Sequence, residues 1–86
     1  MPVYMVERHL PGMTKDQFEG AKKAALEAGK KMATQGKQVR YIRSTYVPGD
    51  GKCMCLFEAA SPDLVKKLNE EAKLPFSRVV EAQDLA

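Results

Sequence analysis

The chain has 86 residues, of which 29% are charged and 44% hydrophobic, and its formal net charge is +3. This length is enough for one domain, 1–86, and the composition is that of a globular protein rather than a disordered one. Carboxylates interleave with the lysines, which argues against nucleic-acid binding. The chain lacks the run of about 18 apolar residues that a membrane span needs. Its first residues do not have the pattern of a secretory signal, so we expect a cytoplasmic protein.

Residues 3–9 alternate as a β-strand does, and Leu10–Gly12 interrupts them. Thr14 and Gln17 have the spacing of a capping box and predict the start of a helix. The helix is expected to end at Gly36, a residue type that favours helix C-termini. Its apolar positions form one narrow stripe: Phe18, Ala21, Ala25, Ala28 and Met32.

The second half of the chain predicts two more strands, a helix and a last strand. Residues 39–47 and 53–59 are rich in β-branched and aromatic residues, and the turn 48–51 between them is typical of a hairpin. Ser61 and Pro62 predict a helix start, and Leu74–Pro75 its end. Residues 78–83 form the last predicted strand.

This order of elements, βαββαβ, predicts an α+β fold of the ferredoxin-like class. Right-handed crossovers then give a four-stranded antiparallel sheet with the strand order four, one, three, two. Both helices lie on one face of this sheet. The other face is left uncovered, and we expect association or function there.

Alternation along each strand divides the strand residues between the two faces. The set with fewer charges is predicted to lie beneath the helices: Tyr4, Val6, Arg8, Ile42, Ser44, Tyr46, Cys53, Cys55, Phe57, Val80 and Ala82. The other set is predicted to form the open face: Val3, Met5, Glu7, His9, Tyr41, Arg43, Thr45, Met54, Leu56, Glu58, Val79 and Glu81. Matching the sets between strands assumes that no bulge intervenes.

The open face would then carry three carboxylates among apolar residues. Its polar cluster consists of Glu7, Glu58, Glu81, Arg43 and Tyr41. A partly buried carboxylate needs a cation, which is either an arginine or a metal ion. Ion pairing with arginine or simple solvation are the alternatives to a metal site.

His9 is the single histidine of the chain and shares a strand face with Glu7. Imidazole together with carboxylate suits nickel, zinc or copper. We therefore take Glu7, His9 and Glu58 as candidate metal ligands, with nickel or another divalent transition metal as the candidate ion. The alternative for His9 is an exposed residue at a strand end.

Cys53 and Cys55 lie about 7 Å apart on one face of a strand. This spacing is poor for a disulfide, and no third metal ligand is close in sequence. We expect both to be buried core thiols. The sequence has no nucleophile paired with a histidine, no phosphate loop and no dinucleotide fingerprint, so no catalytic residue is assigned.

Several segments together resemble a family of small bacterial proteins of unknown function. Residues 4–8 (YMVER) resemble its opening strand, residues 39–44 and 50–59 its central hairpin, and residues 74–81 its closing strand. The resemblance implies a ferredoxin-like fold and a homodimer built sheet to sheet, of the dimeric α+β barrel type. One kind of member is described as a nickel-binding protein.

Three hypotheses follow for the function. The first is a non-catalytic homodimer that associates through the open face and binds nickel. The second is a small enzyme of the dimeric α+β barrel type, such as a cofactor-free oxygenase, with Arg43, Tyr41 and a carboxylate converging on a pocket. The third is a small-molecule sensor or interaction module.

Overall fold

The structure is a computed structural model and describes residues 1–85, so that residue 86 of the predicted domain 1–86 lies outside the described residues. Six elements follow one another along the chain. They are β1 (Val3–His9), α1 (Lys15–Thr34), β2 (Val39–Val47), β3 (Lys52–Ala59), α2 (Pro62–Glu71) and β4 (Arg78–Ala82). The predicted elements are thus confirmed, with β3 beginning one residue earlier and β4 ending one residue earlier than expected. Helix α2 ends at Glu71, before the predicted Leu74–Pro75.

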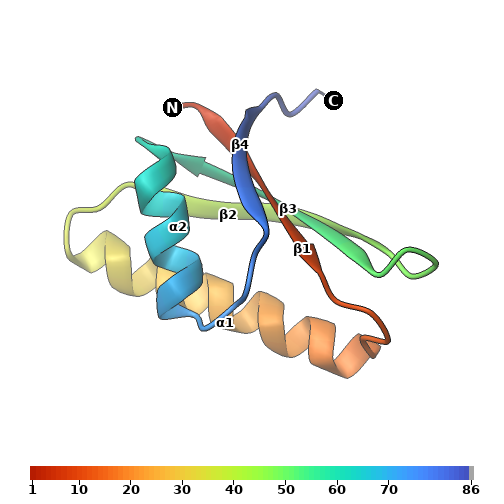
Figure 1. Cartoon of the computed structure of the whole chain (residues 1–86). Helices are drawn as coiled ribbons and strands as arrows, with labels where there is room; N and C mark the ends of the chain where they lie inside the picture. Colours follow the sequence, from red (N-terminus) through yellow and green to blue (C-terminus); the bar gives the residue numbers. More distant parts are fainter. Residues whose placement is uncertain (86) are drawn as a thin grey trace.

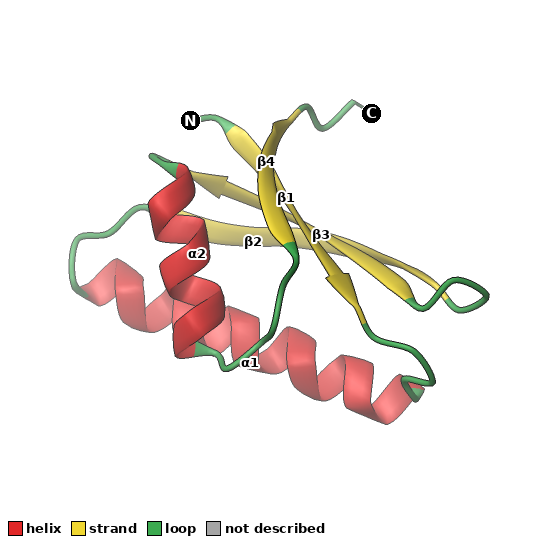
Figure 2. Cartoon of the chain, viewed as in Figure 1, coloured by secondary structure: helices red, strands yellow, loops and turns green. Residues whose placement is uncertain are grey.

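The four strands form one antiparallel sheet in the order β2-β3-β1-β4. Both helices lie on the same side of this sheet (Figure 1), with α1 the longer of the two (Figure 2). The predicted strand order and the ferredoxin-like α+β architecture are therefore confirmed. Strands β1 and β3 occupy the centre of the sheet, and β2 and β4 form its edges.

Both ends of α1 have the capping residues that the sequence predicts. The Thr14 side chain accepts a hydrogen bond from the Gln17 backbone N–H, and the Gln17 side chain accepts one from the Thr14 N–H. Gly36 follows the helix with φ of 77°, and the N–H of Lys37 donates to the carbonyl of Met32. These bonds satisfy terminal groups that the helix itself leaves unpaired.

Helix α2 begins with a predicted cap and ends with an unusual residue. The Ser61 side chain accepts a hydrogen bond from the Leu64 N–H, and Pro62 occupies the first helical position. At the other end Lys73 has φ of 58°, a left-handed conformation that glycine usually provides. The Leu74 N–H bonds to the Asn69 carbonyl across this turn.

The hairpin turn between β2 and β3 contacts the loop that follows β1. The Leu10 N–H donates to the Gly51 carbonyl at 2.6 Å. Gly51 has φ of 66°, and a Cβ at this position would lie 2.9 Å from Pro11 Cα. The close approach of these two loops therefore requires glycine at this position.

The core lies between the sheet and the two helices. It contains residues from the predicted helix stripes and from the helix-facing strand positions: Tyr4, Val6, Ala25, Ala28, Met32, Val39, Tyr41, Cys53, Cys55, Phe57, Ala59, Val65 and Leu68. The small alanines of α1 allow this helix to approach the sheet closely. Both cysteines are free and buried, which confirms the expectation that they lie in the core.

Tyr41 lies beneath the helices, contrary to the prediction that placed it on the open face. The pairing of β2 with β3 shifts register between Tyr41 and Arg43, where a bulge inserts Ile42. A bulge adds one residue to one strand and reverses the alternation on its two sides. Tyr41 and Ser44 consequently share the helix-facing side, and Ile42 does not take its predicted place there.

The alternation of β4 is also opposite to the prediction. Glu81 lies directly across from Tyr4, and Val79 across from Val6, so both belong to the helix-facing side. Val80 and Ala82 pair with Met5 and Val3 and therefore face the open side. The error arises because β4 pairs with β1 in a register that the sequence of β4 does not specify.

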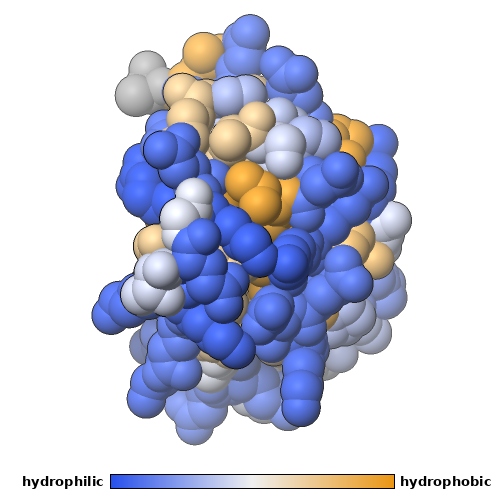
Figure 3. All heavy atoms as spheres, turned by 90° about the vertical axis from the view of Figure 1, so that its left-hand side faces the viewer, coloured by the Kyte–Doolittle hydropathy of each residue, from blue (hydrophilic) through white to orange (hydrophobic). Residues whose placement is uncertain are grey.

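Neither helix in the described part of the chain is long and apolar enough to cross a membrane. The side of the molecule that carries the α1–β2 connection is mainly hydrophilic around a small apolar patch (Figure 3). A groove between α1 and β2, of about 650 Å³, has Lys30, Lys37 and Arg40 among its lining residues.

Candidate functional site

The open face of the sheet has an apolar centre. One row of directly paired positions crosses all four strands: Arg43 of β2, Leu56 of β3, Met5 of β1 and Val80 of β4. Leu56, Met5 and Val80 are partly exposed, as is Met54 in the next row. No helix covers this surface, so four apolar side chains meet solvent in the single chain (Figure 1).

Ion pairs within the chain surround the apolar centre. Glu7 accepts from Arg78 Nε at 3.0 Å, and Glu58 lies 3.3 Å from Arg40 Nη2. Arg43 pairs with Asp84 at 2.9 Å. The two predicted open-face carboxylates Glu7 and Glu58 are therefore each neutralised by an arginine. Glu81, on the other side of the sheet, is not part of this set.

The three predicted metal ligands do not meet within one chain. Glu7 and His9 share the open side of β1, two positions apart. Glu58 lies opposite Val3, at the other end of β1. The separation between the Cα atoms of Glu58 and Met54, the residue opposite Glu7, is about 13 Å along the strand. Residues 1–85 contain no group of three His, Cys, Asp or Glu side chains that could hold a metal ion.

The predicted convergence of Arg43 and Tyr41 does not occur either. Tyr41 is 8% exposed beneath the helices, whereas Arg43 projects from the opposite side toward Asp84. The bulge between them separates the two side chains by the thickness of the sheet. The arrangement that the enzyme hypothesis required is therefore not formed by these residues.

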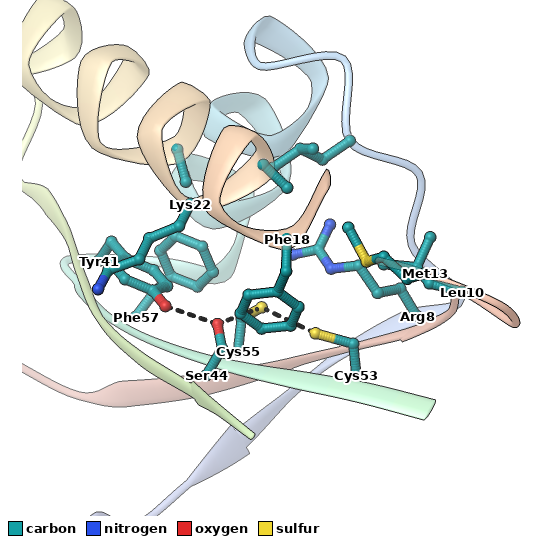
Figure 4. A pocket seen from close by; sticks show the side chains of 13 residues that line it. Arg8, Leu10, Met13, Phe18, Lys22, Tyr41, Ser44, Cys53, Cys55 and Phe57 are labelled. Atoms are coloured by element: carbon teal, nitrogen blue, oxygen red, sulfur yellow. Dashed lines mark hydrogen bonds between the residues drawn. The ribbon is translucent and has the colours of Figure 1, made fainter. Parts of the chain in front are cut away.

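The helix-facing side of β2 and β3 carries a chain of hydrogen bonds that ends on the two cysteines (Figure 4). Tyr41 Oη lies 2.6 Å from Ser44 Oγ, and Ser44 Oγ donates to Cys55 Sγ at 2.9 Å. The sulfur atoms of Cys53 and Cys55 are 3.7 Å apart. Because Ser44 donates to the sulfur, Tyr41 donates to Ser44, and Cys55 is the acceptor at the end of the chain.

Arg8 projects from β1 toward the same side and is 3% exposed. Its guanidinium donates to the Pro75 carbonyl at 3.1 Å and to Asn69 Oδ1 at 2.8 Å. Asn69 is itself fully buried and donates to the Val65 carbonyl at 2.8 Å. Both acceptors of Arg8 are neutral, and none of the ion pairs found among residues 1–85 includes it.

The two thiols have pKa values that move in opposite directions. The hydrogen bond from Cys53 lowers the pKa of Cys55 to about 6 against the opposing effect of burial, and the positive charge of Arg8 also lowers it. The same hydrogen bond, together with burial, raises the pKa of Cys53. Near neutral pH the pair therefore favours a proton on Cys53 and a negative charge on Cys55.

A small cavity adjoins the cysteines. Its volume is about 20 Å³, comparable to the space that one water molecule occupies. Its wall includes Cys53, Cys55, Ser44, Arg8 and Phe18. Space of this size holds a molecule comparable to water and excludes larger ligands. Phe18 of α1 lines the same cavity, and its ring lies beside the Cys55 side chain in the view of Figure 4.

Two features of the sequence indicate the buried group of Arg8, Asn69 and the cysteines. Arg8 was predicted beneath the helices beside both cysteines, where a charged side chain needs a partner. Asn69 follows Val65 by four residues, which places a polar side chain on the buried side of α2. The participation of Tyr41 could not be predicted because it depends on the bulge.

The fold and this site define a small ferredoxin-like domain with an open apolar sheet face and a buried dithiol. The chain belongs to the family described as "Nickel responsive protein SCO4226-like", which matches residues 4–82. It is similar to the crystal structure of SCO4226 from Streptomyces coelicolor A3(2), with a TM-score of 0.83 and 25% identity. The similarity covers 98% of this chain and 99% of the other. No curated protein matches the chain.

The family description raises the question of whether the residues present suit nickel. On the open face, Glu7 and His9 supply two suitable donors, but Glu7 is already paired with Arg78. On the other side, two sulfurs lie close together, but the positive charge of Arg8 acts on them. A single chain therefore provides an incomplete set of ligands at either place.

Proposed function

We propose that this protein is a non-catalytic homodimer that binds nickel through ligands contributed by two copies of the chain. Membership of the nickel-responsive family is the observation on which the metal rests. The uncovered apolar row on the sheet is the observation on which the dimer rests. The dimer and the metal site are linked because one chain has an incomplete set of ligands, and a second copy of the chain doubles the number of donor groups.

Burial of the open face by a second copy is favoured by its chemistry. Leu56, Met5 and Val80 would leave water, and each fully buried side chain of this kind contributes about 1.5–3 kcal/mol. The surrounding carboxylates are already paired with arginines of the same chain. Their neutralisation lowers the cost of removing this face from water.

Substitution of Leu56 tests the dimer. We expect the wild-type chain to sediment as a dimer at micromolar concentration and Leu56→Lys as a monomer, because a lysine would be buried at the centre of the interface. Leu26→Lys is the matched control, since Leu26 is a 42% exposed leucine of α1 on the other side of the sheet. A strictly monomeric wild type, or a dimeric Leu56→Lys, would contradict the proposal.

His9 is the open-face ligand least committed to other contacts. It is exposed and lies opposite Lys52, next to the ion-paired Glu7. A two-fold arrangement of sheets that places His9 and Glu7 of one copy beside Glu58 of the second would let all three predicted ligands bind the same ion.

Nickel titration by calorimetry tests the metal site. We expect two nickel ions per dimer, because the two-fold axis repeats the site, and we expect His9→Ala to lose binding while remaining a dimer. Lys52→Ala is the control, because it changes the residue opposite His9 without removing a ligand. Absence of heat at millimolar nickel would contradict the proposal. So would binding that persists in His9→Ala and disappears in Cys55→Ser, since it would place the metal at the thiols.

We also propose a cytoplasmic location, with which two free cysteines are compatible. Cys53 and Cys55 are both free, and proteins of reducing compartments keep such thiols. Fractionation of cells that express the tagged protein would test this location.

A further inference from the structure

We propose that Cys55 is a modification site at which a small hydroperoxide, such as hydrogen peroxide, oxidises the sulfur to a sulfenic acid. The site consists of Cys55 as the reacting residue, Cys53 and Ser44 as its hydrogen-bond donors and Arg8 as the neighbouring cation. It is independent of the open face and of the nickel proposal.

The burial of Arg8 is the first observation. A guanidinium removed from water is costly unless a negative group is near it. Its two hydrogen-bond acceptors, the Pro75 carbonyl and Asn69 Oδ1, carry no net charge. Among residues 1–85 no carboxylate pairs with it. The neighbouring groups that can become negative are the two thiols and the Tyr41 hydroxyl, and burial raises the pKa of Tyr41, so the negative charge falls to the thiols. Arg8 therefore favours a thiolate at this position.

The hydrogen bonds determine which sulfur carries the charge. Cys55 Sγ accepts from Ser44 at 2.9 Å and lies 3.7 Å from Cys53 Sγ, whereas Cys53 lacks the contact with Ser44. Ser44 is polarised in turn by the Tyr41 hydroxyl, 2.6 Å away. Bonds to a charged acceptor are stronger than bonds to a neutral one, so these donors stabilise the thiolate of Cys55 over its thiol.

The cavity determines which oxidant can reach the sulfur. Its volume is about 20 Å³, and both cysteines line it. Hydrogen peroxide is little larger than water, whereas disulfides such as glutathione disulfide are many times larger. The surrounding wall is predominantly apolar, with Leu10, Met13, Phe18 and Leu74. Lys22 of α1 also lines it and is a second cation besides Arg8. A small uncharged oxidant is therefore the class that fits.

The reaction is a two-electron oxidation of sulfur. The thiolate of Cys55 attacks one oxygen of hydrogen peroxide, an S–O bond forms and the O–O bond breaks. The products are the sulfenic acid and hydroxide, which takes a proton from solvent to become water. The peroxide is the electron acceptor, and no other reactant is needed.

The geometry of β3 prevents the sulfenic acid of Cys55 from forming a disulfide with Cys53. Residues two apart in a strand have Cα atoms about 7 Å apart, at the upper limit for a disulfide, and parallel side chains. Strand β3 is hydrogen-bonded on both sides, by β1 and β2, which opposes the backbone movement that closure would need. The sulfenic acid consequently persists rather than condensing with Cys53.

The test is the pH dependence of peroxide oxidation in the full chain. We expect the folded protein to gain one oxygen by intact mass, at a rate whose midpoint lies near pH 6. The urea-unfolded chain should show a midpoint near the ordinary cysteine value of about 8.5. Peptide mass spectrometry on Cys53→Ser assigns the oxygen to residue 55, and reversal by dithiothreitol distinguishes it from methionine sulfoxide.

Two substitutions separate this role from simple packing. Cys53→Ala removes a donor and should slow oxidation about fivefold at pH 6.5, whereas Cys53→Ser keeps a donor and should restore the rate. Asn69→Asp gives Arg8 a carboxylate and should move the midpoint to higher pH without altering the sulfurs. A folded-state midpoint near 8.5, oxidation confined to methionines, or loss of two hydrogens as a Cys53–Cys55 disulfide would each overturn the proposal.

Discussion

At the scale of single residues, the main feature is the buried charge of Arg8, which forms no ion pair with a carboxylate among residues 1–85. Arg8 lies beneath the helices between Asn69 and the two cysteines, and its neutral acceptors satisfy its hydrogen bonds without balancing its charge. Breaking such an arrangement by removing one partner commonly costs several kcal/mol, about 3–5 for a buried charge. Asn69 and the thiol pair are therefore part of what keeps Arg8 in the core.

The stability of the protein should depend on pH through Cys55. The folded pKa of about 6 is below the unfolded value of about 8.5, so the folded state releases a proton that the unfolded state retains. The resulting stabilisation, on the order of 3 kcal/mol, is fully present above pH 8.5 and is lost as the pH falls through 6.

The measurement is the difference in free energy of unfolding between wild type and Cys55→Ser, from urea titrations between pH 5.5 and 8.5. This difference should increase with pH across the window. A difference that is constant with pH would show that Cys55 stays protonated in the folded protein.

At the scale of the elements, helix ends show how much a local sequence determines. Thr14, Gln17, Gly36 and Ser61 form the caps that their residue types predict. The end of α2 is the exception, because Lys73 adopts the left-handed conformation that suits glycine at the end of α1.

Replacing Lys73 by glycine should therefore stabilise the protein. The side chain is strained at φ of 58°, and relief of this strain should raise the free energy of unfolding by about 0.5–1 kcal/mol. Gly36→Ala is the reciprocal change and should lower it by a similar amount, since it introduces a Cβ at φ of 77°. Chemical denaturation of both variants measures the two effects, and a destabilised Lys73→Gly would contradict the expectation.

The same scale marks the limit of prediction from the sequence. Caps, breakers and alternation were sufficient to predict all six elements, and the rule of right-handed crossovers was sufficient to predict the strand order. They did not predict on which side of the sheet Tyr41 and Glu81 lie. Alternation relates neighbours within one strand, whereas the side on which a residue lies depends on how its strand pairs with the next strand. The bulge at Ile42 reversed one strand, and the register of β4 against β1 reversed another. Because the bulge was not predicted, the hydrogen bonds that join Tyr41, Ser44 and Cys55 were not predicted either.

At the scale of the whole molecule, a domain of this size has a small core and one uncovered sheet face. Folding of 86 residues buries only about 60–65% of the surface that the unfolded chain exposes. Association through the open face would add to that burial. The two thiols and the open face lie on opposite sides of the same sheet, so occupation of one leaves the other unobstructed.

Thermal stability should consequently depend on protein concentration. If folding and association are linked, dilution by a hundredfold lowers the apparent stability by about 2.7 kcal/mol per dimer, and the unfolding midpoint falls by several degrees. Scanning calorimetry at a high and a low concentration measures this shift. Leu56→Lys should show a midpoint that does not vary with concentration, and an invariant wild-type midpoint would argue against a dimer.

Strand β3 carries both sulfurs and is paired along its whole length with β1 on one side and β2 on the other. Its amide protons should be among the last in the chain to exchange with deuterium, because their release requires opening of the sheet rather than fraying of an edge. A reagent that reaches Cys55 through the side-chain cavity should therefore act long before those amides exchange. Comparison of the two rates on one sample would separate chemistry in the intact native state from chemistry that waits for unfolding.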